Sequence, residues 1–402
     1  MKSIIQFKAI TPPLVIITVA LLCLAATGPR VQAVTPPPDG GYPGGNTAEG
    51  QNALLSRSTG GFNAAIGWLS LRGLTTGSFN TGVGAGTLAL NNADQNTATG
   101  AGALLSNTIG SFNTAHGAFA LFTNTEGGGN TATGLQSLFH NTIGNANTAT
   151  GEAALFNNSS GNDNTANGDS TLVNNVTGEG NVAIGSQALH SNTAGSANTA
   201  VGGGALFSST GTGNIAIGFN AGNNVSTANS VICIGLPGQD VSTSCYIGNI
   251  FNVTSSGGTA VFINSDGKLG TTTSSKRFKE EIKPMDKASE ALFVLRPVAF
   301  RYKQEIDPAR TRQLGLVAED VEKVSPDLVV RDKEGKPYSV RYDQVNAMLL
   351  NEFLKEHRKV QELEAALAAV NARLKEQDAK IEKVSMQIEI NRPAAQTVAQ
   401  SP

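Results

Sequence analysis

The stretch that decides the fold is residues 130–151, which read NTATGLQSLFHNTIGNANTATG. The pentapeptide NTATG at 130–134 returns at 147–151, and a leucine stands four positions beyond its first glycine. Similar pentapeptides recur through the middle of the chain at a spacing of seventeen positions, with two steps of sixteen. Their glycines are Gly67, Gly84, Gly100, Gly117, Gly134, Gly151, Gly168, Gly185, Gly202, Gly218 and Gly235. A short fixed period with one apolar position per unit predicts a β-solenoid of about ten coils, in which each coil covers its neighbour.

Each coil is expected to hold one short strand. Strand alternation in the NTAxG pentapeptide directs Ala inward and Thr outward, and the glycine permits the positive φ of a tight corner. The leucine then fills the interior, and the residue after it, on extended backbone, points outward. Those outward residues are Leu105, Phe122, Phe139, Phe156, Val173 and Phe207. An exposed phenylalanine ladder would form a large apolar patch, which predicts that the coils associate with other copies.

Charge is distributed very unevenly along the 402 residues. Residues 51–250 hold two of the 29 basic and seven of the 31 acidic side chains, and they are rich in Gly, Asn, Thr and Ala. Such a composition would indicate disorder, but a disordered segment has no reason to keep leucine in register. A net charge of −2 with no basic cluster gives no reason to expect nucleic acid or an anionic membrane surface as a partner.

The segment 1–33 is typical of an export signal. Two lysines precede an apolar run over 14–26, and Val-Gln-Ala at 31–33 has small residues at the positions that signal peptidases read. The run is too short for a comfortable membrane span. We therefore expect cleavage after Ala33, an extracellular or surface location with no membrane span after signal removal, and a Pro/Gly linker over 34–50.

Residues that could form a disulfide or bind a metal are few. Export would allow Cys233 and Cys245 to pair, but their offsets from the neighbouring corner glycines differ by one, which points them to opposite faces of the sheet. The sequence is compatible both with a disulfide between these two cysteines and with two free thiols. The histidines of the repeats stand at unlike offsets, without metal-ligand spacing, so we expect no metal and no cofactor. They are His116, His140 and His190.

The repeats also support a resemblance to a known kind of protein. Pentapeptides of the NxAIG type, such as NVAIG at 181–185, resemble the heads of trimeric autotransporter adhesins. Those heads are β-rolls packed three around an axis, so the resemblance implies a homotrimeric head over residues 51–250. The chain ends without the membrane-anchoring strands of such adhesins, so we expect that it is not a complete autotransporter.

Two other functions are compatible with a solenoid. A glycan hydrolase of the spike type would need a pair of carboxylates, but the acidic residues of the repeats are scattered at one per coil or fewer. A surface that binds ice or a repetitive glycan would need a regular threonine ladder. The spacing of Thr131 and Thr133 supports such a ladder, but it is broken at Val83, His116 and Asn167.

After a connector over 251–273, the composition becomes that of an ordinary globular domain. The segments that follow are SSKRFKEEI at 274–282, a helix around 288–295, a strand at 297–302, QLGLVAEDV at 313–321, PDLV at 326–329 and VRYD at 340–343. This order resembles the C-terminal intramolecular chaperone of phage endosialidases and other tail spikes, an autoprocessing domain that also occurs in myelin regulatory factors. The resemblance implies a small α+β domain over 274–348 that drives trimer assembly.

That family cuts its own chain just before a serine, with the help of a lysine five residues later. The pair maps to Ser274 and Lys279, which places the cleaved bond at Thr273–Ser274. A serine hydroxyl is a weak nucleophile, and a neutral lysine amine can take its proton. Ser275 stands where the family usually has an acidic residue, and the tandem serines leave the nucleophile ambiguous. In the alternative interpretation, Lys279 is a surface lysine at a helix start that Ser274 caps.

Residues 349–390 are predicted to form a coiled coil, followed by a tail over 391–402. One seam repeats every seven residues, and a second lies three residues later with interruptions at Glu356 and Gln377. The first seam is Phe353, Val360, Leu367, Leu374, Ile381 and Ile388, and the second is Leu349, Leu363, Val370 and Val384. Mixed Leu, Val and Ile fit three strands, whereas a lone helix packed on the preceding domain is the alternative.

The sequence therefore predicts a mainly β protein, with a solenoid head, a small α+β chaperone domain and a C-terminal coiled-coil helix. The predicted function is that of an exported, adhesin-like homotrimeric fibre. Its expected partners are two further copies of itself and a cell-surface or glycan receptor. Enzymatic activity would amount at most to a single self-cleavage.

Overall fold

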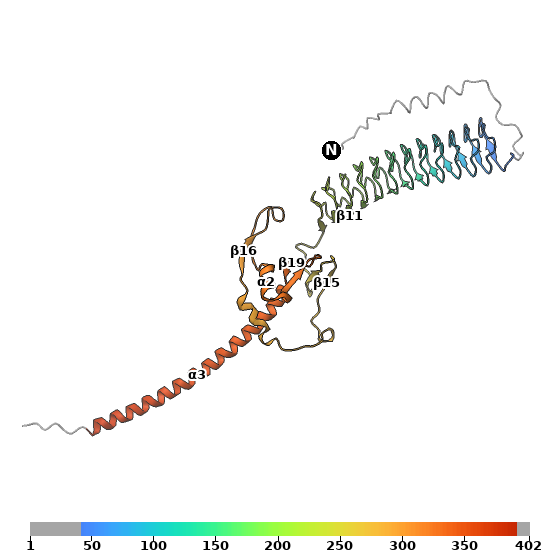
Figure 1. Ribbon diagram of the computed structural model, residues 1–402. Coiled ribbons are helices and arrows are strands. Elements are labelled where there is room, and N and C mark those ends of the chain that lie inside the picture. Colours follow the sequence, from blue (N-terminus) through green and yellow to red (C-terminus); the bar gives the residue numbers. More distant parts are fainter. Residues whose placement is uncertain (1–41, 392–402) are drawn as a thin grey trace, which may run out of the picture. The chain divides into compact units, whose positions relative to one another are not determined.

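A computed structural model describes residues 42–391 (Figure 1). The chain divides into two compact units, Met1–Thr254 and Ser255–Pro402, and each is described by itself. The predicted signal peptide, the first part of the predicted linker and nearly all of the predicted tail lie outside the described residues.

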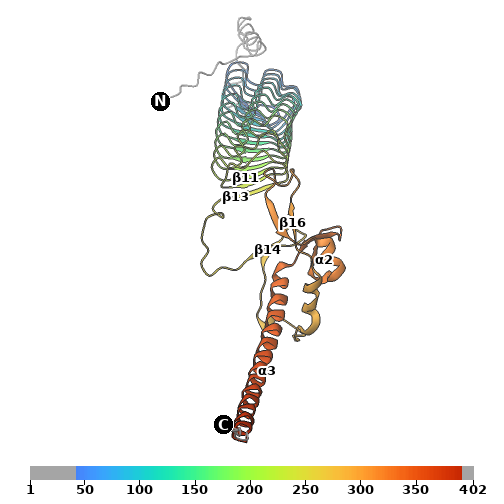
Figure 2. The same ribbon diagram turned by 90° about the vertical axis from the view of Figure 1, so that its left-hand side faces the viewer.

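The first unit is a β-solenoid, which confirms the predicted fold. One parallel sheet contains thirteen short strands in the order of the sequence, and the coils stack along it (Figure 2). The strands are β1 Thr47–Glu49, β2 Ala64–Ile66, β3 Thr81–Val83, β4 Thr97–Thr99, β5 Thr114–His116, β6 Thr131–Thr133, β7 Thr148–Thr150, β8 Thr165–Asn167, β9 Val182–Ile184, β10 Thr199–Val201, β11 Ile215–Ile217, β12 Ile232–Ile234 and β13 Cys245–Ile247. The solenoid is longer than predicted because Gly50, with φ of 117°, is also a corner, and because a strand follows Gly235. Strand pairing begins at Thr47, within the range assigned to the linker.

The corner glycines are required for two reasons. Gly134 has φ of 128°, a backbone conformation that residues with a side chain rarely adopt. A Cβ atom at this position would also lie 2.5 Å from the carbonyl oxygen of Gly151 in the next coil. The central residue of strands β1 to β12, such as Ala132, is buried, as the alternation predicts.

The leucine of each coil fills the interior, but the predicted extended backbone around it is wrong. Leu138 is fully buried with φ of 50°, and Gln136 before it has φ of 57°. The left-handed conformation costs an L-residue about 1–2 kcal/mol. Full burial of a leucine side chain contributes about 1.5–3 kcal/mol, so the leucine offsets the strain of its own turn.

The predicted exposed phenylalanine ladder is also wrong. Phe122 and Phe139 are only 3% and 6% exposed, and with Phe156 they pack in an apolar cluster separate from the coil interior. The ring centroids of Phe122 and Phe139 are 5.1 Å apart with planes at 12°, so the rings stack. Successive coils bring equivalent side chains to stacking distance, and each ring therefore shields the next from water. This ladder gives no reason to expect association between copies.

Two columns of buried asparagines, which the sequence reasoning missed, run along the repeats. In the first, the backbone N–H of Asn130 donates to Oδ1 of Asn113 at 3.0 Å, and its Nδ2 donates to the carbonyl of Gly144 at 2.8 Å. In the second, Nδ2 of Asn124 donates to Oδ1 of Asn107 at 2.7 Å. Buried polar groups need such partners, so the columns tie neighbouring coils together in one register.

The second unit is a small α+β domain followed by a long helix, as predicted. Its elements are β14 Val261–Ile263, β15 Leu269–Thr271, the 3-10 helices η1 Lys276–Phe278 and η2 Asp286–Val294, β16 Val298–Arg301, β17 Arg312–Gly315, α2 Ala318–Val324, the 3-10 helix η3 Pro326–Leu328, β18 Val329–Arg331, β19 Pro337–Val340 and α3 Tyr342–Ile390. The strands form three separate antiparallel pairs. A compact apolar core joins α2, η3, β18, β19 and the first turns of α3.

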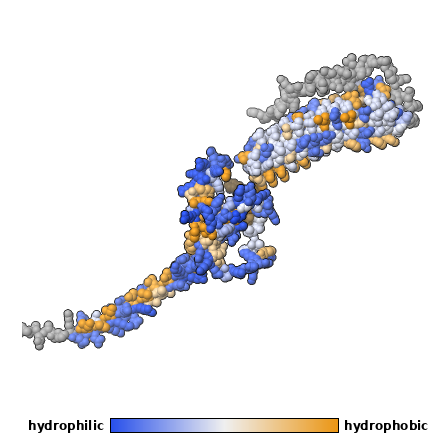
Figure 3. Space-filling model, in the orientation of Figure 1, coloured by the Kyte–Doolittle hydropathy of each residue, from blue (hydrophilic) through white to orange (hydrophobic). Residues whose placement is uncertain are grey.

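Most of α3 is left uncovered by the rest of residues 42–391. Its first turns pack on η2 and η3, whereas the heptad positions beyond them are exposed, including Leu367 at 61% and Ile381 at 62%. Figure 3 shows apolar surface along this helix. The alternative of a helix packed along the domain is therefore wrong for its greater part. Within residues 42–391, no helix is both long enough and apolar enough to cross a membrane.

Candidate functional site

The structure brings the two predicted site residues together. Ser274 and Lys279 lie after strand β15, on either side of the single turn η1, and Nζ of Lys279 is 3.0 Å from Oγ of Ser274. The turn closes with hydrogen bonds from the N–H groups of Phe278 and Lys279 to the carbonyls of Ser275 and Lys276. Because this turn reverses the chain, a side chain five residues further on can reach back to Ser274.

The details of the turn also bear on the alternative interpretation. Ser275, not Ser274, occupies the N-cap position of η1, and no side chain caps the turn. The Ser274 hydroxyl instead accepts a hydrogen bond from the Lys279 ammonium. The helix-cap role is therefore wrong, and of the tandem serines it is Ser274 that lies beside the lysine. The catalytic roles of both residues stay predictions.

The surroundings of this pair are open to solvent. Ser274, Lys276, Lys279, Glu281 and Ile282 line a shallow pocket, and every residue from 255 to 284 is exposed. A lysine that acts as a base must be neutral and must accept the serine proton, and removal from water is what favours a neutral amine. The single chain thus supplies the distance between the two groups but not the dry environment that the chemistry needs.

Two of the three solenoid histidines, His140 and His190, pack against aromatic rings, whereas His116 is exposed on strand β5. The ring of His140 lies edge-on to Phe139 and Phe156, and that of His190 stacks on Phe207 at 4.7 Å. Burial lowers the pKa of both imidazoles. No group of three or more His, Cys, Asp or Glu side chains that could hold a metal ion occurs in residues 42–391.

The two described cysteines are free thiols on opposite faces of the sheet. Cys233 is paired in register with Tyr246 and is buried, whereas Cys245 is paired with Ile232 and is exposed. Burial raises the pKa of the Cys233 thiol. The one-residue difference in their offsets, read from the sequence, therefore corresponds to an inward and an outward side chain.

The outer face of the solenoid sheet changes character along its length. Threonines dominate the outward positions of β4 to β8, although His116 and Asn167 interrupt them. From β9 onward the outward side chains are mostly apolar and between 36% and 45% exposed, which the sequence reasoning missed. These side chains are Val182, Ile184, Ile215, Ile217, Ile232, Ile234 and Ile247. The signal was present in the sequence, since the same two positions of each pentapeptide change from Thr to Val or Ile.

Comparison with known proteins gives one match. Residues 274–330 match the family described as chaperone of endosialidase. The matched segment begins at Ser274 and includes Lys279, and it continues through η2, β16, β17 and α2. Neither the curated proteins nor the solved structures yielded a match. The C-terminal unit of this chain is therefore similar, over residues 274–330, to the chaperone of endosialidase, and a domain of this kind implies assembly as a trimer.

Proposed function

We propose that this protein is an exported homotrimeric fibre, with an adhesin-like solenoid head whose assembly depends on the C-terminal chaperone domain. The observation that carries the proposal is the bare apolar stripe of α3. Its apolar heptad positions, among them Phe353, Leu367 and Ile381, are 47–68% exposed, directly after a domain that implies trimer assembly. Three such helices would bury one another's stripes as a coiled coil.

The solenoid offers a second surface for association. The apolar outward side chains of β9 to β13 form an exposed face, and soluble proteins seldom leave such a face uncovered. Packing of these faces against one another would bury β-branched residues such as Ile217 and Ile234. This face takes the place of the phenylalanine ladder as the reason to expect contact between heads.

Self-cleavage at Thr273–Ser274 is the finer part of the proposal. Oγ of Ser274 attacks the carbonyl carbon of Thr273 while a neutral Lys279 amine takes the hydroxyl proton. The peptide C–N bond breaks, the proton passes to the leaving nitrogen of Ser274, and the resulting ester is hydrolysed by water. The 3.0 Å distance between Nζ and Oγ supports this assignment. Contact with the other two copies would supply the dry environment that the single chain lacks.

The test is a mass measurement of the purified, secreted product. An uncut trimer gives light scattering of about three chain masses and one polypeptide. A cut trimer gives two polypeptides, a head that spans 34–273 and a C-terminal fragment that spans 274–402. A stable monomer at micromolar concentration would contradict the fibre, and an intact folded trimer would contradict only the self-cleavage.

The threonine-rich outward face of β4 to β8 favours a second candidate, binding of ice or of a repetitive glycan. Thr131, Thr133, Thr148 and Thr150 are all exposed on neighbouring strands, whose spacing is about 4.8 Å. Thermal hysteresis and glycan-array binding of the trimer test the two ligands. Replacement of Thr131 and Thr148 by valine should abolish either activity, whereas the same change at Thr177, which is exposed but lies outside the strands, should not.

A further inference from the structure

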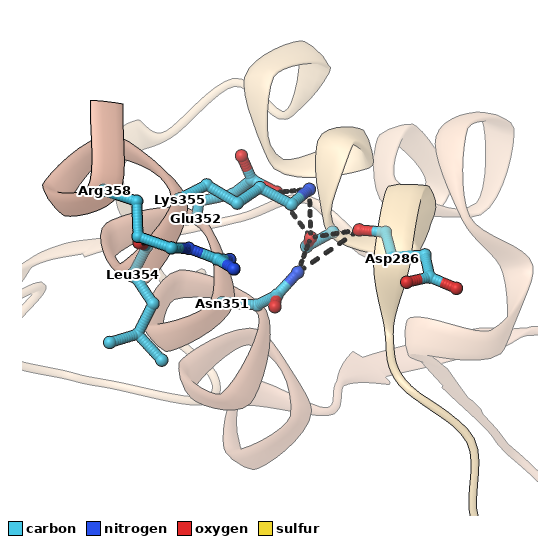
Figure 4. A network of polar contacts seen from close by, with 7 residues as sticks. Asp286, Asn351, Glu352, Leu354, Lys355 and Arg358 are labelled. Atoms are coloured by element: carbon cyan, nitrogen blue, oxygen red, sulfur yellow. Dashed lines mark hydrogen bonds and ion pairs between the residues drawn. The ribbon is translucent and has the colours of Figure 1, made fainter. Parts of the chain in front are cut away.

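A partly buried polar cluster joins α3 to the domain that precedes it. Ser289 of η2 is completely buried, and its Oγ lies 2.5 Å from Oε1 of Glu352, 2.6 Å from Nδ2 of Asn351 and 3.4 Å from Nζ of Lys355 (Figure 4). The carbonyl of Asp286 accepts from both Ser289 and Asn351. We call these five residues the clasp.

The clasp contains the least exposed ion pair of residues 42–391. Nζ of Lys355 is 2.6 Å from Oε1 of Glu352, and the two side chains are 30% and 12% exposed. The ion pair between Lys323 and Asp320 has the same i,i+3 spacing and a similar distance of 2.7 Å, but its side chains are 74% and 62% exposed. Removing charges from water costs free energy, so net stability does not explain why this ion pair is partly buried.

The clasp lies on a different face of α3 from the heptad stripe. Met348, Glu352 and Lys355 are spaced i, i+4 and i+7, so they share one face, which packs on the domain. Leu349 follows Met348 and Phe353 follows Glu352, so each is rotated by about 100° from the residue before it, and both are exposed. The face of α3 that packs on the domain therefore determines the direction in which the exposed heptad side chains point.

We propose that the clasp fixes the rotation of α3 about its own axis, so that every copy presents the Leu349–Phe353 stripe in the same direction before the helices meet. The inference rests on the coiled coil proposed above. Apolar contacts such as those of Met348 are non-directional and tolerate a rotated helix. The hydrogen bonds of Ser289 to Glu352 and Asn351 can form in only one setting, which makes the clasp a determinant of trimer specificity.

The test replaces the clasp by apolar side chains of similar volume in the full chain, with Ser289→Ala, Glu352→Leu and Lys355→Met combined. Thermal unfolding and native mass spectrometry are measured on this variant and on the wild type. The matched control is Asp320→Leu with Lys323→Met, which removes the exposed pair of the same spacing. We expect the clasp variant to keep or raise its Tm, while its share of trimer falls at least about twofold in favour of other oligomers. The control should remain trimeric.

Two outcomes would overturn the inference. A clasp variant that forms the same single trimer as the wild type would show that rotation is set elsewhere. A clasp variant that unfolds, while the control folds, would make the clasp an element of stability and not of specificity. If the wild type itself is monomeric, it is the proposed fibre that fails, and the two failures are thereby distinguished.

Discussion

The solenoid and the C-terminal unit of this chain differ in how far they bury their side chains. In the solenoid, each coil buries its leucine, its central alanine and its asparagines against the next coil of the same chain. In the C-terminal unit, the main buried apolar cluster has five members, and every residue from 255 to 284 is exposed. The first unit is close to complete within one chain, apart from the apolar outer face of β9 to β13, whereas the second leaves the apolar heptad side chains of α3 exposed. The two units therefore differ in how much of their apolar surface they cover by themselves.

The largest expected effect concerns the proposed self-cleavage in the C-terminal unit. Ser274→Ala removes the proposed nucleophile, Lys279→Ala removes the proposed base, and Lys279→Arg substitutes a group that stays protonated, so each should abolish cleavage. Denaturing gel electrophoresis and mass spectrometry of the purified trimer measure the cut. Ser275→Ala is the matched control and should be cut like the wild type. Cleavage that persists in Ser274→Ala but stops in Ser275→Ala would assign the nucleophile to the neighbouring serine.

The next effect compares a glycine of each unit. Gly134→Ala combines a φ of 128° with a Cβ placed 2.5 Å from the Gly151 oxygen, so it should destabilise the solenoid by about 3–5 kcal/mol. Gly267, in the turn between β14 and β15, has φ of 82° but open space around its missing Cβ. Gly267→Ala should cost only about 1–2 kcal/mol. Urea unfolding followed by circular dichroism checks both, and equal losses would contradict the close-packed column of glycines.

A smaller effect is expected from the asparagine columns. Asn130→Ala removes the partner of Gly144 and of the N–H of Asn147, and each buried group left without a partner costs about 1–3 kcal/mol. Asn145→Ala removes similar hydrogen bonds at an exposed position, where water replaces them, and should cost much less. The midpoints of thermal unfolding give the comparison. A loss at Asn145 as large as that at Asn130 would mean that burial is not what makes the column important.

The smallest effect concerns the last coil. Asp240 accepts hydrogen bonds from the Ser226 hydroxyl and from the N–H groups of Ala228 and Ser226, which hold its pKa well below the usual range. Since the folded pKa is depressed, this contribution is present above the unfolded pKa of about 3.9 and is lost as pH falls toward the folded value. Asp240→Asn should therefore lower the Tm at pH 7, and the difference should shrink below about pH 4. A Tm difference that stays constant with pH would mean that the shape of the Asp240 side chain, and not its charge, causes the effect.

The sequence predicted the fold better than it predicted which side chains are exposed. The constant repeat period, the inward alanine and the corner glycine were sufficient for the solenoid, because a repeated local rule generates the whole structure. The order of segments after residue 274 supported the resemblance to the chaperone domain, and that resemblance implied the pairing of Ser274 with Lys279. In each case the information is local in the chain.

The errors have a common physical origin. The left-handed turn at Leu138, the stacking of Phe122 on Phe139 and the pairing of Asn113 with Asn130 all involve contacts between one coil and the next. A side chain that points away from its own coil was expected to be exposed, but the coil pitch brings its equivalent from the next coil close enough to cover it.

The sequence by itself determined the period and the type of most elements, because these follow from local spacing and side-chain type. Only the tertiary structure decided which apolar side chains remain exposed. In the folded protein Phe139 is buried, Ile217 and Leu367 are exposed, and Ser289 is buried against Glu352 and Lys355. Exposure is a property of what packs across from a side chain, and that neighbour lies too far away in the sequence for the local pattern to specify it.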